Sequence, residues 1–191
     1  ARPAAIMPPT VPAPRGVPGN DPFMLALGAK GPDFTLPDHE GTPVRLADLL
    51  ACGPVVVFFY PGDFTPACSA EACLFRDMHE VATRAGVQVV GINPGGRRMH
   101  AAFRAAFKLP YALLSDKGGK VARAYNAMGL MGLMARRVTY LIAPDGTIAD
   151  GVEAALDLSK HRAFMRRVLE RSPVHGVEQS GAGAPPPQDL G

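Results

Sequence analysis

The stretch that decides the fold spans residues 54–92 and reads PVVVFFYPGDFTPACSAEACLFRDMHEVATRAGVQVVGI. Residues 54–60 form a continuous run of β-branched and aromatic residues, which is typical of a strand buried on both faces. Residues 87–92 repeat this pattern and predict a second buried strand. Between them, residues 66–84 are predicted to form one long helix, which begins at Thr65 as N-cap, a residue type favoured there.

A core-facing stripe runs along the predicted helix. Leu74, Met78 and Val81 recur at helical spacing, with Phe75 and Ala82 beside them. Side chains spaced by three or four residues share one face of a helix. We therefore expect this face to pack against the sheet.

The alternation of strands and helices continues on both sides of this unit. Residues 33–46 read as a β-hairpin, because apolar runs flank an acidic turn that contains glycine. Further helices are predicted over 46–50, 97–108, about 118–125 and 158–171, and further strands over 112–115, 137–143 and 147–152. This order predicts an α/β fold, with a central mixed β-sheet flanked by helices and an N-terminal β-hairpin.

The two ends differ in composition from the middle. Residues 1–23 contain seven prolines and predict an extended arm, because proline neither propagates a helix nor fills a sheet interior. Residues 175–191 are rich in glycine and proline and predict a disordered tail. Residues 24–174 are predicted to form one folded domain, which suits a chain of 191 residues.

The composition excludes several classes of protein. The longest apolar stretches run about ten residues, short of the ~20 that a membrane span needs, so no membrane partner is expected. The net charge of +3 comes from scattered basic residues without an aromatic stripe, which argues against nucleic acid as a partner. The chain has three cysteines, too few for a disulfide-scaffolded secreted domain.

Cys68 lies where the chemistry of such a fold is expected, at the carboxyl end of the first buried strand. It takes the third position of the predicted helix, where backbone N–H groups and the helix dipole favour a thiolate. A buried, inert cysteine is an equally good interpretation of this position taken alone.

Cys73 follows five residues later on the same helix and points more outward than Cys68. The two Cα atoms are then roughly 8.5 Å apart, beyond the ~7 Å that a disulfide tolerates. The thiols can pair only if the first turn unwinds, which indicates an inner attacking cysteine and an outer resolving cysteine. The spacing does not fit a zinc site.

The segment YPGDFTPAC, residues 60–68, resembles the signature of the peroxiredoxin family, in which a threonine stands three residues before the reactive cysteine. A second cysteine five residues on resembles the peroxiredoxin Q subfamily, also called bacterioferritin comigratory protein, of the AhpC/TSA superfamily. The similarity runs from about Gly31 through LPYALLSD and RVTYLIAPDG to the last helix. It implies a thioredoxin-like fold.

The resemblance implies roles for five residues. Cys68 matches the peroxidatic cysteine, which peroxide oxidises to a sulfenic acid, and Cys73 matches the resolving cysteine that condenses with it to a disulfide. Thr65 matches a hydroxyl that hydrogen-bonds the peroxide and the thiolate, and Pro61 matches a residue that shields the thiolate from water. Arg137 matches the arginine that stabilises the thiolate and orients the peroxide.

Other polar residues near this pattern leave alternatives. Arg136 is the neighbouring candidate for the arginine, because alternation along a strand puts one of the pair on the site face, and the family pattern favours Arg137. Glu71 is expected either to pair with an active-site arginine or to lie in solvent. The spacing of the histidines, including His100 and His161, supports no catalytic or metal constellation.

The implied activity is that of a thiol peroxidase acting on hydrogen peroxide and alkyl hydroperoxides, recycled by thioredoxin or a similar dithiol, with no metal or organic cofactor. A one-cysteine peroxidase, with an external thiol that resolves Cys68, is the alternative enzyme. A redox-sensing or partner-binding protein on the same fold is the alternative without turnover. We expect a monomer in the cytoplasm, with a dimer and an exported, periplasmic form as alternatives.

Two features have no assigned part in this chemistry. Cys52 lies in a turn before the first buried strand and is interpreted as a bystander. Residues 126–135 read NAMGLMGLMA and are interpreted as core packing or a loop. The alternative for this segment is an apolar flap for organic peroxides or a partner, because methionine surfaces adapt to different ligands.

Overall fold

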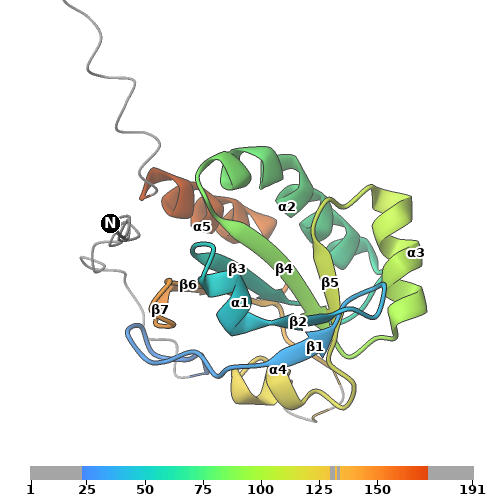
Figure 1. The fold of residues 1–191 in the computed structure, drawn as a ribbon. Coiled ribbons are helices and arrows are strands. Elements are labelled where there is room, and N and C mark those ends of the chain that lie inside the picture. Colours follow the sequence, from blue (N-terminus) through green and yellow to red (C-terminus); the bar gives the residue numbers. More distant parts are fainter. Residues whose placement is uncertain (1–22, 130–131, 133, 172–191) are drawn as a thin grey trace, which may run out of the picture.

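The computed structural model describes residues 23–129, 132 and 134–171, which are drawn in colour in Figure 1. The predicted arm over 1–23, apart from its last residue, lies outside the described residues, as does the predicted tail over 175–191.

A five-stranded mixed sheet forms the centre of the fold, in the strand order β5-β4-β3-β6-β7. The strands β3 (Val55–Phe59), β4 (Gln88–Asn93) and β5 (Ala112–Ser115) run parallel to one another. β6 (Val138–Ile142) is antiparallel to β3, and β7 (Ile148–Glu153) is antiparallel to β6. The carboxyl ends of the three parallel strands therefore lie at the same end of the sheet as the start of β6.

Three helices cover one face of this sheet (Figure 1). They are α2 (Pro66–Arg84), α3 (Arg97–Phe107) and α5 (Leu158–Glu170), and their buried residues form one apolar cluster with that face. α2 contacts both α3 and α5, so it lies between them. The helix that carries both predicted site cysteines is thus central to its layer.

The other face is covered by shorter elements. α1 (Leu46–Leu50) and α4 (Lys120–Ala124) pack there with a second apolar cluster. The two-stranded hairpin of β1 (Thr35–Pro37) and β2 (Pro43–Arg45) lies on the same side. The structure confirms the predicted α/β class, the mixed sheet with flanking helices and the N-terminal hairpin.

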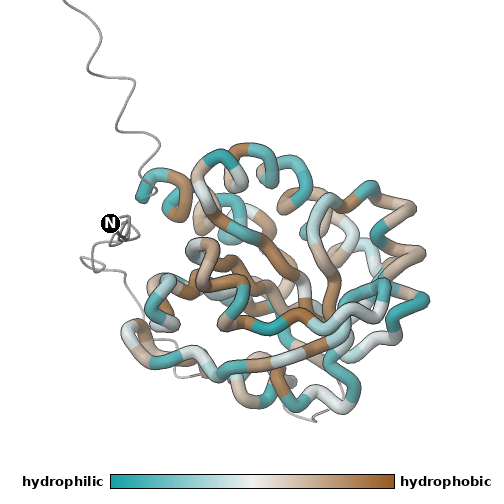
Figure 2. Tube along the Cα trace, in the orientation of Figure 1, coloured by the Kyte–Doolittle hydropathy of each residue, from teal (hydrophilic) through white to brown (hydrophobic). Residues whose placement is uncertain are grey.

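The central strand β3 is buried along its whole length, as its composition predicts. Val56 and Phe58 belong to the cluster beneath α2 and α5, whereas Val55, Val57 and Phe59 belong to the opposite cluster. Burial of each such side chain stabilises the fold by about 1.5–3 kcal/mol. Figure 2 shows the result as hydrophobic colour concentrated along the central strands.

The predicted helix over 66–84 is confirmed, but its predicted core face is partly wrong. Val81 is 45% exposed, whereas Phe75 and Ala82 are fully buried. Cys68, Phe75 and Ala82 follow one another at intervals of seven residues, which make almost two full turns, so they lie in one line along the helix. Val81 lies about 100° around the helix from Ala82 and faces outward. The same line directs Cys68 inward.

The methionine-rich segment over 126–135 behaves in two ways. Met128 is partly buried against the cluster on the hairpin side of the sheet. Met134 is exposed, and residues 130, 131 and 133 lie outside the described residues. The packing interpretation holds for Met128, and the flap interpretation stays a prediction.

Candidate active site

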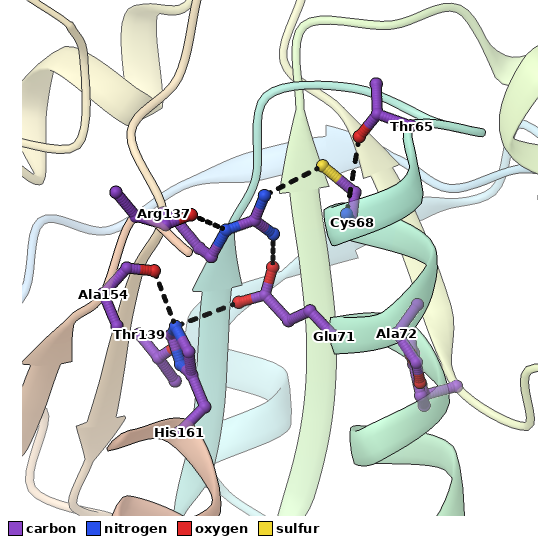
Figure 3. Close-up of polar contacts among 10 residues, drawn as sticks. Thr65, Cys68, Glu71, Ala72, Arg137, Thr139, Ala154 and His161 are labelled. Atoms are coloured by element: carbon purple, nitrogen blue, oxygen red, sulfur yellow. Dashed lines mark hydrogen bonds and ion pairs between the residues drawn. The ribbon is translucent and has the colours of Figure 1, made fainter. Parts of the chain in front are cut away.

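Cys68 lies in the first turn of α2, directly after the loop that follows β3 (Figure 3). Its side chain is buried, and its backbone N–H donates to Thr65 Oγ1 at 3.4 Å. Thr65 is thus the N-cap of α2, as predicted, and Pro66 takes the first helical position. The positive end of the helix dipole is directed at this turn and favours a negatively charged sulfur.

Arg137 approaches the same sulfur from the start of β6. Its Nη2 donates to Cys68 Sγ at 3.4 Å, and the guanidinium is almost fully buried. The antiparallel register explains the approach, because Val138 pairs with Phe59 at the carboxyl end of β3. A guanidinium keeps its charge at all ordinary pH values, so it is a fixed positive partner for a thiolate.

Arg136 points away from the site. Its Nε donates to Glu153 at 2.9 Å, and its Nη1 donates to the carbonyl of Asn126 at 3.0 Å. The alternation along the strand therefore places Arg137, and not Arg136, at Cys68, as the family pattern implies.

Two further contacts fix the orientation of the Arg137 guanidinium. Its Nη1 bonds to Glu71 Oε2, and its Nε donates to the carbonyl of Ala155 at 2.8 Å. Glu71 is fully buried, so the alternative of a solvated glutamate is wrong. Burial raises the pKa of Glu71 to about 7, although Arg137 opposes this shift. Above neutrality Glu71 is ionised and forms a buried ion pair with Arg137.

His161 of α5 lies next to Glu71, on the side away from the sulfur of Cys68 (Figure 3). Its Nε2 lies 3.4 Å from Glu71 Oε1 and 3.4 Å from the carbonyl of Ala154. Its Nδ1 lies 3.2 Å from Thr139 Oγ1. Burial lowers the pKa of His161 to about 4, so the ring is neutral near pH 7. Because both groups near Nε2 are acceptors, the neutral ring carries its proton there.

Sequence reasoning did not assign His161 to the site. Cys68 and Glu71 stand three residues apart on one helix, and this spacing is a usable signal that both side chains share a face. Arg137 directly precedes β6 and His161 lies in α5, and nothing local in the sequence links either one to Glu71. Only the packing of α2 and α5 on one sheet face brings the four side chains together.

Cys73 lies two turns into the same helix and is partly exposed. Cys68 and Cys73 are both free thiols on a continuous helix, which agrees with the predicted separation. The carbonyl of Ala72 accepts from the buried Tyr111 hydroxyl at 2.8 Å. The two sulfurs can approach each other only if α2 is disturbed between them.

Pro61 and Cys52 take no part in the polar contacts described above. Pro61 lies half-buried in the loop between β3 and α2. Cys52 is an exposed free thiol after α1. Within the described residues, no group of three or more histidine, cysteine or acidic side chains is arranged to hold a metal ion. None of the helices described has the length and apolar character of a membrane span.

Comparisons with known proteins agree on one family. A model of the AhpC/TSA family matches residues 27–150. Curated relatives named "Peroxiredoxin Q, chloroplastic" include one from Sedum lineare, 43% identical over 65% of this chain and 67% of its own length. Another, from Arabidopsis thaliana, is 43% identical over 63% of this chain and 56% of its own. The match thus spans about half to two thirds of these relatives.

Solved structures show the same architecture. "Peroxidoxin BcpB" from Mycobacterium tuberculosis has a TM-score of 0.70 and 37% identity, over 75% of this chain and 96% of that one. Peroxiredoxin Q from Xanthomonas campestris has a TM-score of 0.65 and 24% identity, over 72% of this chain and 89% of that one, which shows the likeness of fold.

Proposed function

The chain belongs to the AhpC/TSA family and has its thioredoxin-like fold, and from this premise we propose that it is a thiol-dependent peroxidase. Its substrates in this proposal are hydrogen peroxide and alkyl hydroperoxides. The contact between Arg137 Nη2 and Cys68 Sγ at 3.4 Å carries the proposal, because it sets a buried sulfur at a helix start against a fixed positive charge. Such surroundings favour the thiolate, which is the nucleophilic form of cysteine.

In the first step, the Cys68 thiolate attacks the terminal oxygen of the peroxide. A sulfur–oxygen bond forms, the oxygen–oxygen bond breaks, and Cys68 becomes a sulfenic acid. The other oxygen leaves as hydroxide or alkoxide and takes up a proton from solvent, which gives water or an alcohol. Negative charge shifts from the sulfur to the departing oxygen, and the Arg137 guanidinium is placed to stabilise it at both ends of the transfer.

Thr65 and Pro61 have supporting roles in this step. Thr65 Oγ1 accepts from the Cys68 backbone N–H, so its own hydroxyl hydrogen is available to a peroxide oxygen or to the sulfur. Pro61 lies in the loop that leads to the same turn, where its ring limits the access of water.

In the second step, Cys73 resolves the sulfenic acid. Its sulfur attacks Cys68 Sγ, a disulfide forms, and the hydroxyl group leaves as water. Because both cysteines lie on α2, the first turns of this helix must unwind before the sulfurs meet. A dithiol such as thioredoxin then returns both thiols by exchange.

The activity is tested by peroxide consumption with thioredoxin and its reductase as the electron source. We expect turnover by the wild-type protein, no turnover by the variant Cys68→Ser, and unchanged turnover by Cys52→Ser, a matched control at an exposed cysteine. Peroxide consumption by Cys68→Ser at the wild-type rate would refute the proposal.

The one-cysteine alternative is separated by Cys73→Ser. If Cys73 resolves the sulfenic acid, this variant reacts once with peroxide at the normal rate and then fails to turn over with thioredoxin. Sustained turnover of Cys73→Ser would favour an external resolving thiol. The monomeric state and the cytoplasmic location stay predictions.

A further inference from the structure

A second buried pair of polar side chains lies beside the loop that leads to Cys68. His100 Nδ1 is 2.7 Å from Asp63 Oδ2, and the two side chains are 0% and 1% exposed. Asp63 belongs to the loop between β3 and α2, and His100 lies in the first turn of α3. The pair therefore ties the active-site loop to a neighbouring helix.

The Asp63 carboxylate also binds the ends of two strands. Its Oδ1 accepts from the Tyr60 hydroxyl at 2.8 Å and from Asn93 Nδ2 at 3.1 Å. Burial, together with Asp63, raises the pKa of Tyr60 well above its ordinary value of 10.0, so this hydroxyl stays a donor. One carboxylate thus joins β3, β4 and α3 at the end of the sheet where Cys68 lies.

The His100 ring is enclosed so that one nitrogen faces Asp63. A Cβ atom at Gly95 would lie 3.0 Å from His100 Cε1 and 2.6 Å from Asn93 Oδ1, so only glycine lets the loop approach this closely. Among the described residues, His100 Nε2 has no hydrogen-bond partner. The polar contact of this side chain is therefore the one with Asp63.

The next residue of the loop is held by apolar contact to the same helix. Phe64 has a φ of 60°, a left-handed conformation that is strained for a residue with a bulky side chain. Its ring packs at 5.2 Å from Phe103 and 6.2 Å from Phe107, centroid to centroid. α3 therefore contacts the loop at two successive residues, at Asp63 through His100 and at Phe64 through its ring. Thr65, the N-cap of α2, follows directly.

We propose that Asp63 and His100 form a latch that fastens the β3–α2 loop to α3 and so resists the unwinding of the first turns of α2. The inference rests on the proposed function only for its catalytic consequence. Asp63 and His100 are positioning residues, because they act on Cys68 through the loop and the helix start.

The latch has a consequence for the fate of the sulfenic acid. Cys68 as a sulfenic acid either condenses with Cys73, which requires unwinding, or attacks a second peroxide and becomes a sulfinic acid, with release of water or an alcohol. A latch that resists unwinding slows the first route and leaves the second unchanged. It therefore sets the peroxide concentration at which the enzyme is over-oxidised.

A purely stabilising role explains the pair less well. Buried polar pairs lose much of their attraction to desolvation, and apolar residues of similar volume often stabilise a fold equally well. What the polar pair adds is a defined attachment point, since it fixes one carboxylate to three elements at once. This attachment is local to the helix start that must move.

The test compares His100→Leu and Asp63→Asn with two reference variants. His100→Asn keeps a donor near the position of Nδ1 and should behave closest to wild type. Asp116→Asn is the matched control, because Asp116 is an equally buried carboxylate whose oxygens accept from Val121 and Ala122 at the start of α4, on the opposite face.

Hydrogen exchange of the reduced proteins is followed by mass spectrometry over residues 65–73. We expect exchange in this segment to rise at least about tenfold in His100→Leu and in Asp63→Asn, because a hydrogen bond to a charged group is lost. The peroxide concentration that converts half of Cys68 to sulfinic acid should rise in the same two variants. Asp116→Asn should change neither quantity.

Unchanged exchange over residues 65–73 in both latch variants, or an increase equal to that of Asp116→Asn, would overturn the latch. Exchange in reduced protein involves no peroxide, so it decides this point by itself. Failure of the wild-type protein to form a disulfide between Cys68 and Cys73 would instead refute the proposed cycle. The two failures are thus distinguishable.

Discussion

The carboxylate of Glu71 bonds to one nitrogen of the Arg137 guanidinium while another nitrogen of the same group donates to Cys68 Sγ. Glu71 and Cys68 share the inner face of α2, so the helix that carries the sulfur also orients the cation that contacts it. This arrangement couples the geometry of the site to the integrity of the first turns of α2. Unwinding the helix separates the sulfur from its cation.

Removal of the Arg137 guanidinium should slow the reaction of Cys68 with peroxide. We expect the second-order rate of Arg137→Gln to fall by about 10²–10³-fold, as for other buried donors that stabilise developing charge. Stopped-flow measurement on reduced protein tests this rate. Arg136→Gln is the control, since Arg136 pairs with Glu153 outside the site, and its rate should match wild type. Equal rates for the two variants would contradict the assignment.

Glu71→Gln should have a smaller effect on the same rate. The amide keeps an acceptor for Arg137 but loses the charge, so we expect a fall of roughly tenfold, the size of one hydrogen bond to a charged group. The same stopped-flow assay measures it. A loss as large as that of Arg137→Gln would mean that Glu71 acts on more than the orientation of the guanidinium.

Glu71 and His161 should make opposite contributions to the pH dependence of stability. Burial raises the pKa of Glu71 from 4.5 to about 7. The contribution of Glu71 to the free energy of unfolding is fully present below pH 4.5 and is lost as the pH rises through 7. Burial lowers the pKa of His161 from 6.5 to about 4, so its contribution is present above pH 6.5 and is lost as the pH falls through 4. Between pH 4.5 and 6.5 the two contributions change with pH in opposite directions and cancel each other.

Replacing either residue alone should reveal how the other one makes the free energy of unfolding depend on pH. Relative to wild type, the free energy of unfolding of Glu71→Gln should rise with pH between 4.5 and 6.5, and that of His161→Asn should fall. The upper limit for either slope is about 1.4 kcal/mol per pH unit. Urea unfolding of reduced protein across this range measures both. Parallel curves for the three proteins would show that neither group changes its protonation on folding.

Thr65 should affect both the helix and the chemistry. Thr65→Val loses the cap on the Cys68 N–H, which costs about 1 kcal/mol of stability. It also loses the hydroxyl that we assign to the peroxide, so its rate with peroxide should fall. Thr65→Ser keeps both functions and should resemble wild type in urea unfolding and in the stopped-flow assay. A stability loss in Thr65→Val without a change in rate would limit this residue to capping.

The elements of the fold were predictable because their signals are local. β3 is an unbroken apolar run, and α2 begins at a threonine followed by proline, as the structure confirms. The core face of α2 was less certain, because apolar residues occupy two adjacent lines of the helix. The predicted core face included both lines, and the structure buries Leu74, Phe75 and Ala82 but leaves Val81 exposed.

The site was predictable only in part. The cap at Thr65 and the place of Cys68 at a helix start follow from the sequence alone. The reactivity of Cys68 and the choice of Arg137 follow from the family resemblance. Glu71 was left between two interpretations, since the sequence does not show that the guanidinium of Arg137 comes within reach. The pairing of His100 with Asp63, across 37 residues of sequence, depends on the packing of α3 beside the β3–α2 loop.

The intact mass of the reduced protein after one equivalent of hydrogen peroxide, with peptide mapping, tests the central claim most directly. We predict a loss of about two mass units, with Cys68 joined to Cys73 within one chain, which also demonstrates the unwinding of α2. A gain of one oxygen on Cys68 with Cys73 unmodified would contradict the two-cysteine cycle, and an unchanged mass would contradict the peroxidase itself.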